Sequence, residues 1–280
     1  MPDSGTPDWM TSAAAPDEAS AGLDTNVPHI ARVYDYWLGG KDNFAADRDA
    51  AEKVITAFPD IQISVRAQRA FLGRAVHFLV AEAGVRQFLD IGTGLPSANN
   101  THEVAQRAAP DSRVVYVDND PIVLAHARAL LTGTREGATS YLEADLRETE
   151  KILQEAAQVL DFAEPVAVLL LGVLHCISDA EEPAAIVSRL LAAVAPGSYL
   201  VISHPAADVT TEQMSEATRD YNEQSPVPLT MRTHEEVCRI FDGWELVEPG
   251  VVQLHRWRPG TGDLANAREL ANYGGVARKA

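Results

Sequence analysis

Three acidic residues in this chain stand at the ends of short apolar runs, in an order that suits recognition of a nucleoside. Asp90 lies in the first run and is followed at once by a loop with Gly92 and Gly94, and the acids Asp118 and Asp145 come after the next two runs. Glycines let a loop turn tightly and approach a ligand, because no Cβ stands in the way. Ligands of open α/β sheets bind outside the carboxyl ends of the strands. The pattern therefore predicts a nucleoside pocket, with a plain turn carrying incidental glycines as the alternative.

Each acid has a predicted role. Asp118 comes 24 residues after Gly94, the offset of an acid whose two oxygens accept from vicinal ribose hydroxyls. Asp145 can accept from an adenine amine while the backbone N–H of Leu146 meets a ring nitrogen. Its alternative is an N-cap for a helix that begins at Arg147.

The charge of Asp90 favours S-adenosylmethionine over a dinucleotide. A carboxylate beside the glycine loop would repel a pyrophosphate by about 1 kcal/mol or more even in high dielectric. S-adenosylmethionine carries an ammonium and a sulfonium instead, and S-adenosylhomocysteine is the product that it leaves. No lysine follows a tyrosine at the spacing of a short-chain dehydrogenase, and Pro96 interrupts the dinucleotide fingerprint. His175 and Cys176 are adjacent and lack metal-ligand spacing, so no metal is expected.

Two side chains are candidates for catalysis. His175 follows the fourth apolar run and could act as a general base, position an acceptor, or serve a structural role. Tyr36 belongs to an aromatic segment, His29 to Phe44, that could fold over the cofactor as a lid or pack as ordinary helix. His204 and Tyr221 are weaker candidates on later loops. The predicted cofactor residues are Asp90, Gly92, Thr93, Gly94, Asp118, Asn119, Asp145, Leu146 and Gly172.

The elements that position these residues alternate along the chain. Continuous apolar runs suit strands of a parallel sheet covered on both faces, and helical patterns lie between them. A doubly wound α/β fold follows, in which residues 244–247 and 251–257 are expected to form a closing hairpin. The predicted strands are Gln87–Ile91, Val114–Asp118, Thr139–Leu142, Val166–Leu171 and Tyr199–Ser203.

Composition divides the chain and excludes several classes of partner. Residues 1–25 are expected to be a disordered tail, 26–84 a helical cap or lid, 85–258 the cofactor-binding domain and 259–280 a surface segment. The net charge of −17 argues against nucleic acid and anionic membranes as partners. No apolar run approaches the length of a membrane span, and the first residues lack a signal-peptide pattern. We expect a cytoplasmic protein, monomeric or homodimeric.

Four segments together resemble one known family. They are Asn26-Val27-Pro28 with Tyr34 to Phe44, Asp90 to Pro96, Asn100 to Gln106, and Val115 to Pro121. The chain, over about residues 26 to 258, is similar to the actinobacterial S-adenosyl methyltransferase family formerly classed as a domain of unknown function. The resemblance implies a Rossmann-like class I fold, a seven-stranded, mostly parallel sheet with an antiparallel last strand. Gln68 and Ser97 depart from the family's usual Asn and Thr.

The expected function is therefore transfer of a methyl group from S-adenosylmethionine to a small-molecule acceptor, because no basic surface suggests a macromolecule. A protein that binds the cofactor as a sensor or partner module, without catalysis, is the alternative. An NAD-dependent oxidoreductase is disfavoured by Asp90 and Pro96.

Overall fold

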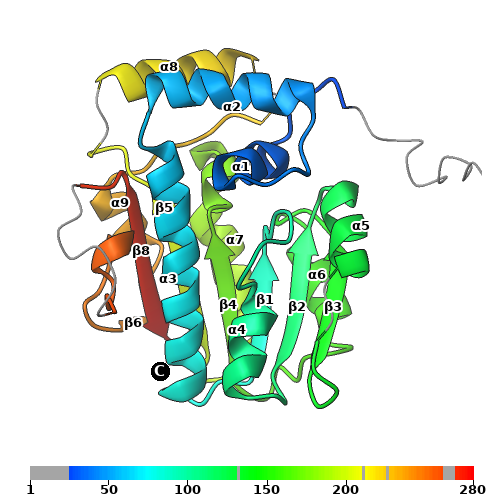
Figure 1. Ribbon diagram of the computed structural model, residues 1–280. Helices are drawn as coiled ribbons and strands as arrows, with labels where there is room; N and C mark the ends of the chain where they lie inside the picture. The colour runs from blue at the N-terminus through cyan, green and yellow to red at the C-terminus, as the bar shows by residue number, and fades with distance from the viewer. Residues whose placement is uncertain (1–24, 131–132, 210–211, 225–226, 261–268) are drawn as a thin grey trace, which may run out of the picture.

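The computed structural model describes residues 25–130, 133–209, 212–224, 227–260 and 269–280. The expected disordered tail lies outside these residues, apart from residue 25. Figure 1 shows one sheet with helices on both faces and a further group of helices across one end. None of the helices in the described ranges has the length and apolar character needed to cross a bilayer.

The first five strands form the parallel part of the sheet. They are β1 (Gln87–Ile91), β2 (Arg113–Asp118), β3 (Ala138–Glu143), β4 (Val166–Leu171) and β5 (Tyr199–Pro205). The strand order is β3-β2-β1-β4-β5-β8-β6, so the chain reverses its direction of travel between β1 and β4. Such a switch point is where ligands bind in doubly wound sheets. The predicted Rossmann-like class I fold, mostly parallel, is confirmed, but the sheet in the described residues has eight strands rather than the expected seven.

Side chains of the central strand β4 enter a different core on each face, which explains its unbroken apolar sequence. Ala167 and Leu169 pack with α3 and α4, whereas Val168 and Leu170 pack with α6 and α7. The helices are α1 (Ile30–Leu38), α2 (Ala45–Ala57), α3 (Ile61–Ala81), α4 (Thr101–Ala108), α5 (Pro121–Leu130), α6 (Thr149–Ala156), α7 (Pro183–Ala192), α8 (Glu212–Gln224) and α9 (His234–Arg239), with 3₁₀ turns η3 (Leu174–Cys176), η4 (Asp179–Glu181) and η5 (Leu254–Arg256).

The carboxyl-terminal part of the sheet differs from the expected hairpin. β6 (Glu245–Leu246) and β7 (Val252–Gln253) each pair antiparallel with β8 (Asn272–Arg278) rather than with each other. β8 also pairs antiparallel with β5 along its full length. The expectation of a surface segment over 259–280 is therefore wrong for β8, whose residues 273–277 are buried.

Two helices at the amino terminus lie across the carboxyl ends of the strands, and we call α1 and α2 together the cap. Figure 1 shows α2 running beside α8 above the sheet, with α1 beneath it. α1 ends at Gly39, whose φ of 85° closes the helix in the left-handed conformation. α8 was not expected from the sequence. Tyr221 lies on this helix rather than on a loop.

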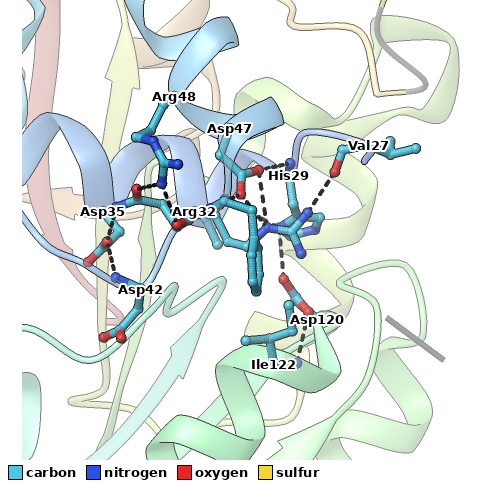
Figure 2. A network of polar contacts seen from close by, with 12 residues as sticks. Val27, His29, Arg32, Asp35, Asp42, Asp47, Arg48, Asp120 and Ile122 are labelled. Carbon is cyan, nitrogen blue, oxygen red and sulfur yellow. Dashed lines mark hydrogen bonds and ion pairs between the residues drawn. The ribbon is translucent and has the colours of Figure 1, made fainter. Parts of the chain in front are cut away.

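One buried carboxylate organises the cap. Asp47 is fully buried and accepts hydrogen bonds from the backbone N–H of His29 and of Phe44, at 2.9 and 2.8 Å. It also accepts from Nε of the buried Arg32 at 2.9 Å, and Figure 2 shows this guanidinium reaching on to the carbonyl of Val27. The cap is thus held together by its own polar contacts.

Two histidine–aspartate contacts join the cap to α5. His29 Nδ1 lies 3.0 Å from Asp120 Oδ2, a contact that Figure 2 draws at the start of α5. Within α5, six residues after Asp120, His126 Nε2 lies 3.6 Å from Asp42 Oδ1 in the loop after α1. The cap therefore meets the sheet domain beside the residues that follow β2.

Candidate functional site

A cavity of about 370 Å³ opens where the carboxyl ends of β1, β2 and β4 meet the cap. Its size falls in the range of small-molecule sites, about 300–1,000 Å³. The cavity is lined by all of the predicted cofactor residues, which are Asp90, Gly92, Thr93, Gly94, Asp118, Asn119, Asp145, Leu146 and Gly172. The structure therefore brings together residues from the ends of four different strands, β1, β2, β3 and β4.

The glycine loop after β1 is shaped by contacts that a side chain would block. Gly92 has a φ of 75°, and a Cβ at this position would lie 2.5 Å from Val173. Gly94 has a φ of 64°, and its N–H donates to Asp118 Oδ2 at 2.9 Å. The loop is thereby fixed against the residue that ends β2, and its backbone faces the cavity.

Asp118 is buried and already partly hydrogen-bonded. Its Oδ1 accepts from the N–H of Asp120 at 3.0 Å, in addition to the contact between Oδ2 and Gly94. Burial raises the pKa of Asp118, against the effect of these two backbone donors. A carboxylate has about four acceptor positions, so each oxygen keeps capacity for a ligand hydroxyl. The observed orientation fits the predicted ribose contact.

Asp90 carries a buried carboxyl group whose ionised form a positively charged ligand would stabilise. It is 5% exposed, and Thr101 Oγ1 donates to its Oδ2 at 2.6 Å. Burial raises the pKa of Asp90 to about 6, while Thr101 and Arg69 oppose the rise. A cationic group in the cavity would stabilise the ionised form.

The alternative interpretation, in which Asp145 caps a helix that begins at Arg147, is wrong. α6 begins at Thr149, two residues later than Arg147, and Asp145 instead accepts from the backbone and the guanidinium of Arg147 at 2.9 Å. Asn119 donates its side-chain amide to Asp145 Oδ2 at 3.3 Å. This long contact is the one that an adenine amine could replace. Leu146 is buried beside it and contributes an apolar surface.

Gly172 lies at the end of β4, against a side chain from α3. A Cβ on Gly172 would come within 2.6 Å of Gln68 Nε2, which donates to the carbonyl of Leu171 at 3.2 Å. Gln68, noted as a departure from the family's Asn, is therefore a cavity residue. Its amide fixes α3 against the strand end.

His175 lines the cavity on the turn after β4. Burial lowers the pKa of His175 to about 4, and the positive charge of Arg232 lowers it further. Its buried Nδ1 has no hydrogen-bond partner among the described residues. The imidazole is therefore neutral at pH 7 and has an unused polar atom.

In contrast to His175, His204 has hydrogen-bond partners within the fold for both of its ring nitrogens. Its Nδ1 lies 2.8 Å from the carbonyl of Pro205, which makes Nδ1 the protonated nitrogen, and Arg232 donates to Nε2 at 2.8 Å. The same guanidinium donates to the carbonyls of Leu174 and Ile177. Arg232 and His204 thus hold the turn that carries His175.

The aromatic segment presents different side chains to the cavity from the one expected. Tyr36 is absent from the cavity lining, and its hydroxyl donates to Glu52 of α2. Tyr34 and Trp37, on the other face of the same helix, line the cavity instead. The proposed catalytic role of Tyr36 has no geometric support, because its hydroxyl is engaged within the cap.

Arg69 is a cavity residue that the sequence interpretation missed. Its Nη2 donates to the carbonyls of Ala98 and Asn99 at 3.1 and 3.0 Å, on the loop before α4. Its Nε is buried and has no hydrogen-bond partner within the described part of the chain. A guanidinium with an unused N–H beside a ligand cavity is suited to a carboxylate.

Within the described ranges, no group of three or more His, Cys, Asp or Glu side chains is arranged to hold a metal ion. The two cysteines, Cys176 and Cys238, are not joined in a disulfide. Carboxylates, guanidinium groups, the imidazole of His175 and the thiol of Cys176 all line the cavity.

Known proteins resemble this chain over almost its full length. A family model described as S-adenosyl methyltransferase matches residues 16–280. A DUF574 family protein from Streptomyces avermitilis is 44% identical with a TM-score of 0.89, and the match covers 92% of this chain and 99% of that one. A candidate methyltransferase from Thermobifida fusca is 42% identical with a TM-score of 0.84, over 92% and 97% of the two chains.

More distant structures share the fold alone. The mitomycin 7-O-methyltransferase MmcR is 16% identical with a TM-score of 0.50, over 92% of this chain and 74% of that one. No curated protein matches the chain.

Proposed function

The chain belongs to the S-adenosyl methyltransferase family, and from that premise we propose that it methylates an uncharged small molecule held between the strand ends and the cap. The protein is a methyltransferase that uses S-adenosylmethionine. The observation that carries the proposal is one cavity that runs from the glycine loop to the underside of the cap.

The residues at the strand ends fit the cofactor group by group. Asp118 supplies acceptors for the ribose, and Asp145 with Leu146 lies where the adenine would bind. Asp90 is a buried carboxyl that a cationic ammonium would stabilise, and the unpaired Nε of Arg69 suits the carboxylate of the same amino-acid group. The absence of side chains at Gly92 and Gly172 lets Val173 and Gln68 pack against the strand ends that carry these groups.

His175 is proposed as a positioning residue for the acceptor. When bound, S-adenosylmethionine supplies an electrophilic methyl group on sulfur. A neutral imidazole at the end of β4 can accept a hydrogen bond from an acceptor O–H or N–H and so orient its lone pair. A pKa of about 4 makes the imidazole too weak a base to retain that proton at pH 7, so the proton leaves to water. Alignment alone can supply much of the rate of such a transfer.

The cap is proposed to exclude water from the reacting groups. Tyr34 and Trp37 of α1 line the cavity from above, and the network around Asp47 holds this helix in place. The cofactor and the acceptor would therefore meet in an enclosed site rather than on an open surface.

The binding test compares the wild-type protein with Asp118→Ala in calorimetric titrations with S-adenosylhomocysteine. Loss of charge-assisted hydrogen bonds to the ribose should weaken binding by about 1–3 kcal/mol. Transfer of labelled methyl groups from S-adenosylmethionine to a panel of neutral small molecules then tests catalysis. Unchanged affinity in the variant would refute the ribose assignment, and binding without transfer to any acceptor would favour the sensor alternative.

A further inference from the structure

The cavity continues past the cofactor residues into an apolar chamber beneath the cap. Side chains from α1, α2, α3, α8 and the segment 227–231 contribute to it. The residues that define this chamber are Trp37, Val54, Phe58, Ile61, Met214 and Met231. Figure 1 shows α1, α2 and α8 together above the carboxyl ends of the strands, with α2 beside α8.

Charged side chains are confined to the other end of the cavity. Asp90, Asp118, Asp145 and Arg147 come from the strand ends, and Arg69 is bonded to the loop before α4. Among the described residues, α2, α8 and the segment 227–231 contribute no Asp, Glu, Lys or Arg to the lining. A charged ligand buried in this chamber would lose its hydration without gaining a partner, which is costly.

Polar groups in the chamber wall are hydrogen-bonded to one another, which leaves few donors or acceptors for a ligand. Asn222 of α8 exchanges two hydrogen bonds with the backbone of Leu229, at 2.7 and 2.8 Å. The N–H of Thr230 donates to the carbonyl of His175 at 2.7 Å, which joins the wall to the turn after β4. Thr218 donates its hydroxyl to the carbonyl of Met214. The wall is fixed, and its polar groups are used within it.

Two buried polar atoms from α3 and η3 line the cavity and have no hydrogen-bond partner among the described residues, Ser64 Oγ and His175 Nδ1. The same cavity is lined by the aromatic rings of Trp37 and Phe58 and by the thioethers of Met214 and Met231. Rings and thioethers make favourable contacts with aromatic ligands. The cavity thus combines a large apolar surface with a polar anchor at His175.

We propose that this chamber binds a neutral aromatic acceptor that presents a single O–H or N–H group to His175. The proposal rests on the proposed function and names the substrate class for the same site. The covalent step forms a bond between the acceptor oxygen or nitrogen and the methyl carbon as the bond from that carbon to sulfur breaks. The acceptor proton is released to water.

The test uses 1-naphthol as the probe and 1-naphthoate as its anionic counterpart. Each is titrated by calorimetry into protein saturated with S-adenosylhomocysteine, so the readout does not depend on turnover. We expect 1-naphthol to bind at least about tenfold more tightly than 1-naphthoate, because the carboxylate would be buried without a partner. Equal affinities, or no binding of 1-naphthol, would overturn the proposal.

A charge placed in the chamber provides the matched variant. Val54→Asp should weaken 1-naphthol binding by about tenfold or more, whereas Thr56→Asp, at an exposed position of the same helix, should not change it. Val54→Thr is the milder substitution if the aspartate prevents folding, and it should weaken binding several-fold. Unchanged naphthol affinity in both Val54 variants would contradict the chamber assignment.

The affinity for S-adenosylhomocysteine distinguishes a failure of the proposed function from a failure of the proposed acceptor class. It should be the same in the wild-type protein and in the Val54 and Thr56 variants, because neither position belongs to the strand ends. Failure of the wild-type protein to bind S-adenosylhomocysteine would refute the proposed function. Retained cofactor binding with no preference for the neutral probe would refute the acceptor class alone.

Discussion

Replacing Arg69 by glutamine should remove the group that we assign to the carboxylate of S-adenosylmethionine. Arg69 has one buried N–H without a partner, while another nitrogen of its guanidinium is bonded to the loop before α4. Charge-assisted hydrogen bonds are worth about 1.5–3 kcal/mol. The dissociation constant for S-adenosylhomocysteine should therefore rise by about 10- to 150-fold.

The assay is calorimetric titration with two ligands that differ in the group concerned. S-adenosylhomocysteine carries the amino-acid carboxylate, and 5′-methylthioadenosine lacks the whole amino-acid group. Arg69→Gln should weaken only the first ligand. Arg66→Gln, which removes the same charge from an exposed position three residues earlier on α3, should weaken neither.

Two results would refute this reasoning. An unchanged affinity for S-adenosylhomocysteine would mean that Arg69 makes no contact with the cofactor. Equal losses for both ligands would mean that Arg69 acts only by holding the loop at Ala98 and Asn99, since that loop would then be disturbed for any adenosyl ligand.

Three further substitutions test the frame of the site. Asp47→Asn should lower the free energy of unfolding by about 3 kcal/mol, because it leaves a buried guanidinium uncompensated; urea unfolding measures this, with exposed Asp49→Asn as the unaffected control. Asp90→Asn should stabilise the ligand-free protein at pH 7 by about 2–3 kcal/mol. The wild-type native state holds the Asp90 proton up to a pKa of about 6, so its stability falls as the pH rises from 3.8 to about 6; an equal fall in the variant would count against this. Gly92→Ala should cost about 1–3 kcal/mol more than Gly94→Ala, because both have positive φ but only the first has a side chain within 4 Å of the added Cβ; similar thermal midpoints would show that no clash exists.

The parallel half of the fold could be predicted because its signals are local. β4 is a continuous apolar run, and its bounds agree with the predicted strand. The acids Asp90 and Asp118 stand at the ends of such runs, and parallel strands bring their carboxyl ends to one edge of the sheet. The residues of the cofactor end could therefore be named from the sequence.

β8 could not be predicted, because its glycines have a tertiary cause. A Cβ on Gly274 would lie 2.6 Å from Leu254 and 2.9 Å from Phe71, and one on Gly275 would lie 3.0 Å from Val251. Close packing against the strand requires these glycines, whereas in the sequence two adjacent glycines indicate a turn. Local patterns carry no information about which distant side chain comes so close.

Contacts with distant parts of the chain also explain why Arg69 and Trp37 could not be assigned to the site from the sequence. Arg69 lies off the apolar face of α3, which in isolation indicates solvent, and only the loop at Ala98 makes it part of a cavity. Tyr36 and Trp37 are neighbours on α1, and the position of α2 decides which of them faces inward. α8 is a mostly polar segment whose place beside α2 could not be read from its own residues.

The position of β8 has a consequence for biosynthesis. β5 contains the fully buried run Leu200, Val201 and Ile202, and its outer edge pairs with β8, which is made after residues 206–271. During that interval the edge offers unpaired N–H and C=O groups beside apolar side chains, which is the pattern that adds strands from other chains. The risk of aggregation through this edge thus falls late in synthesis, after the residues of the cofactor end have been made. It ends once β8, which runs to Arg278, pairs with β5.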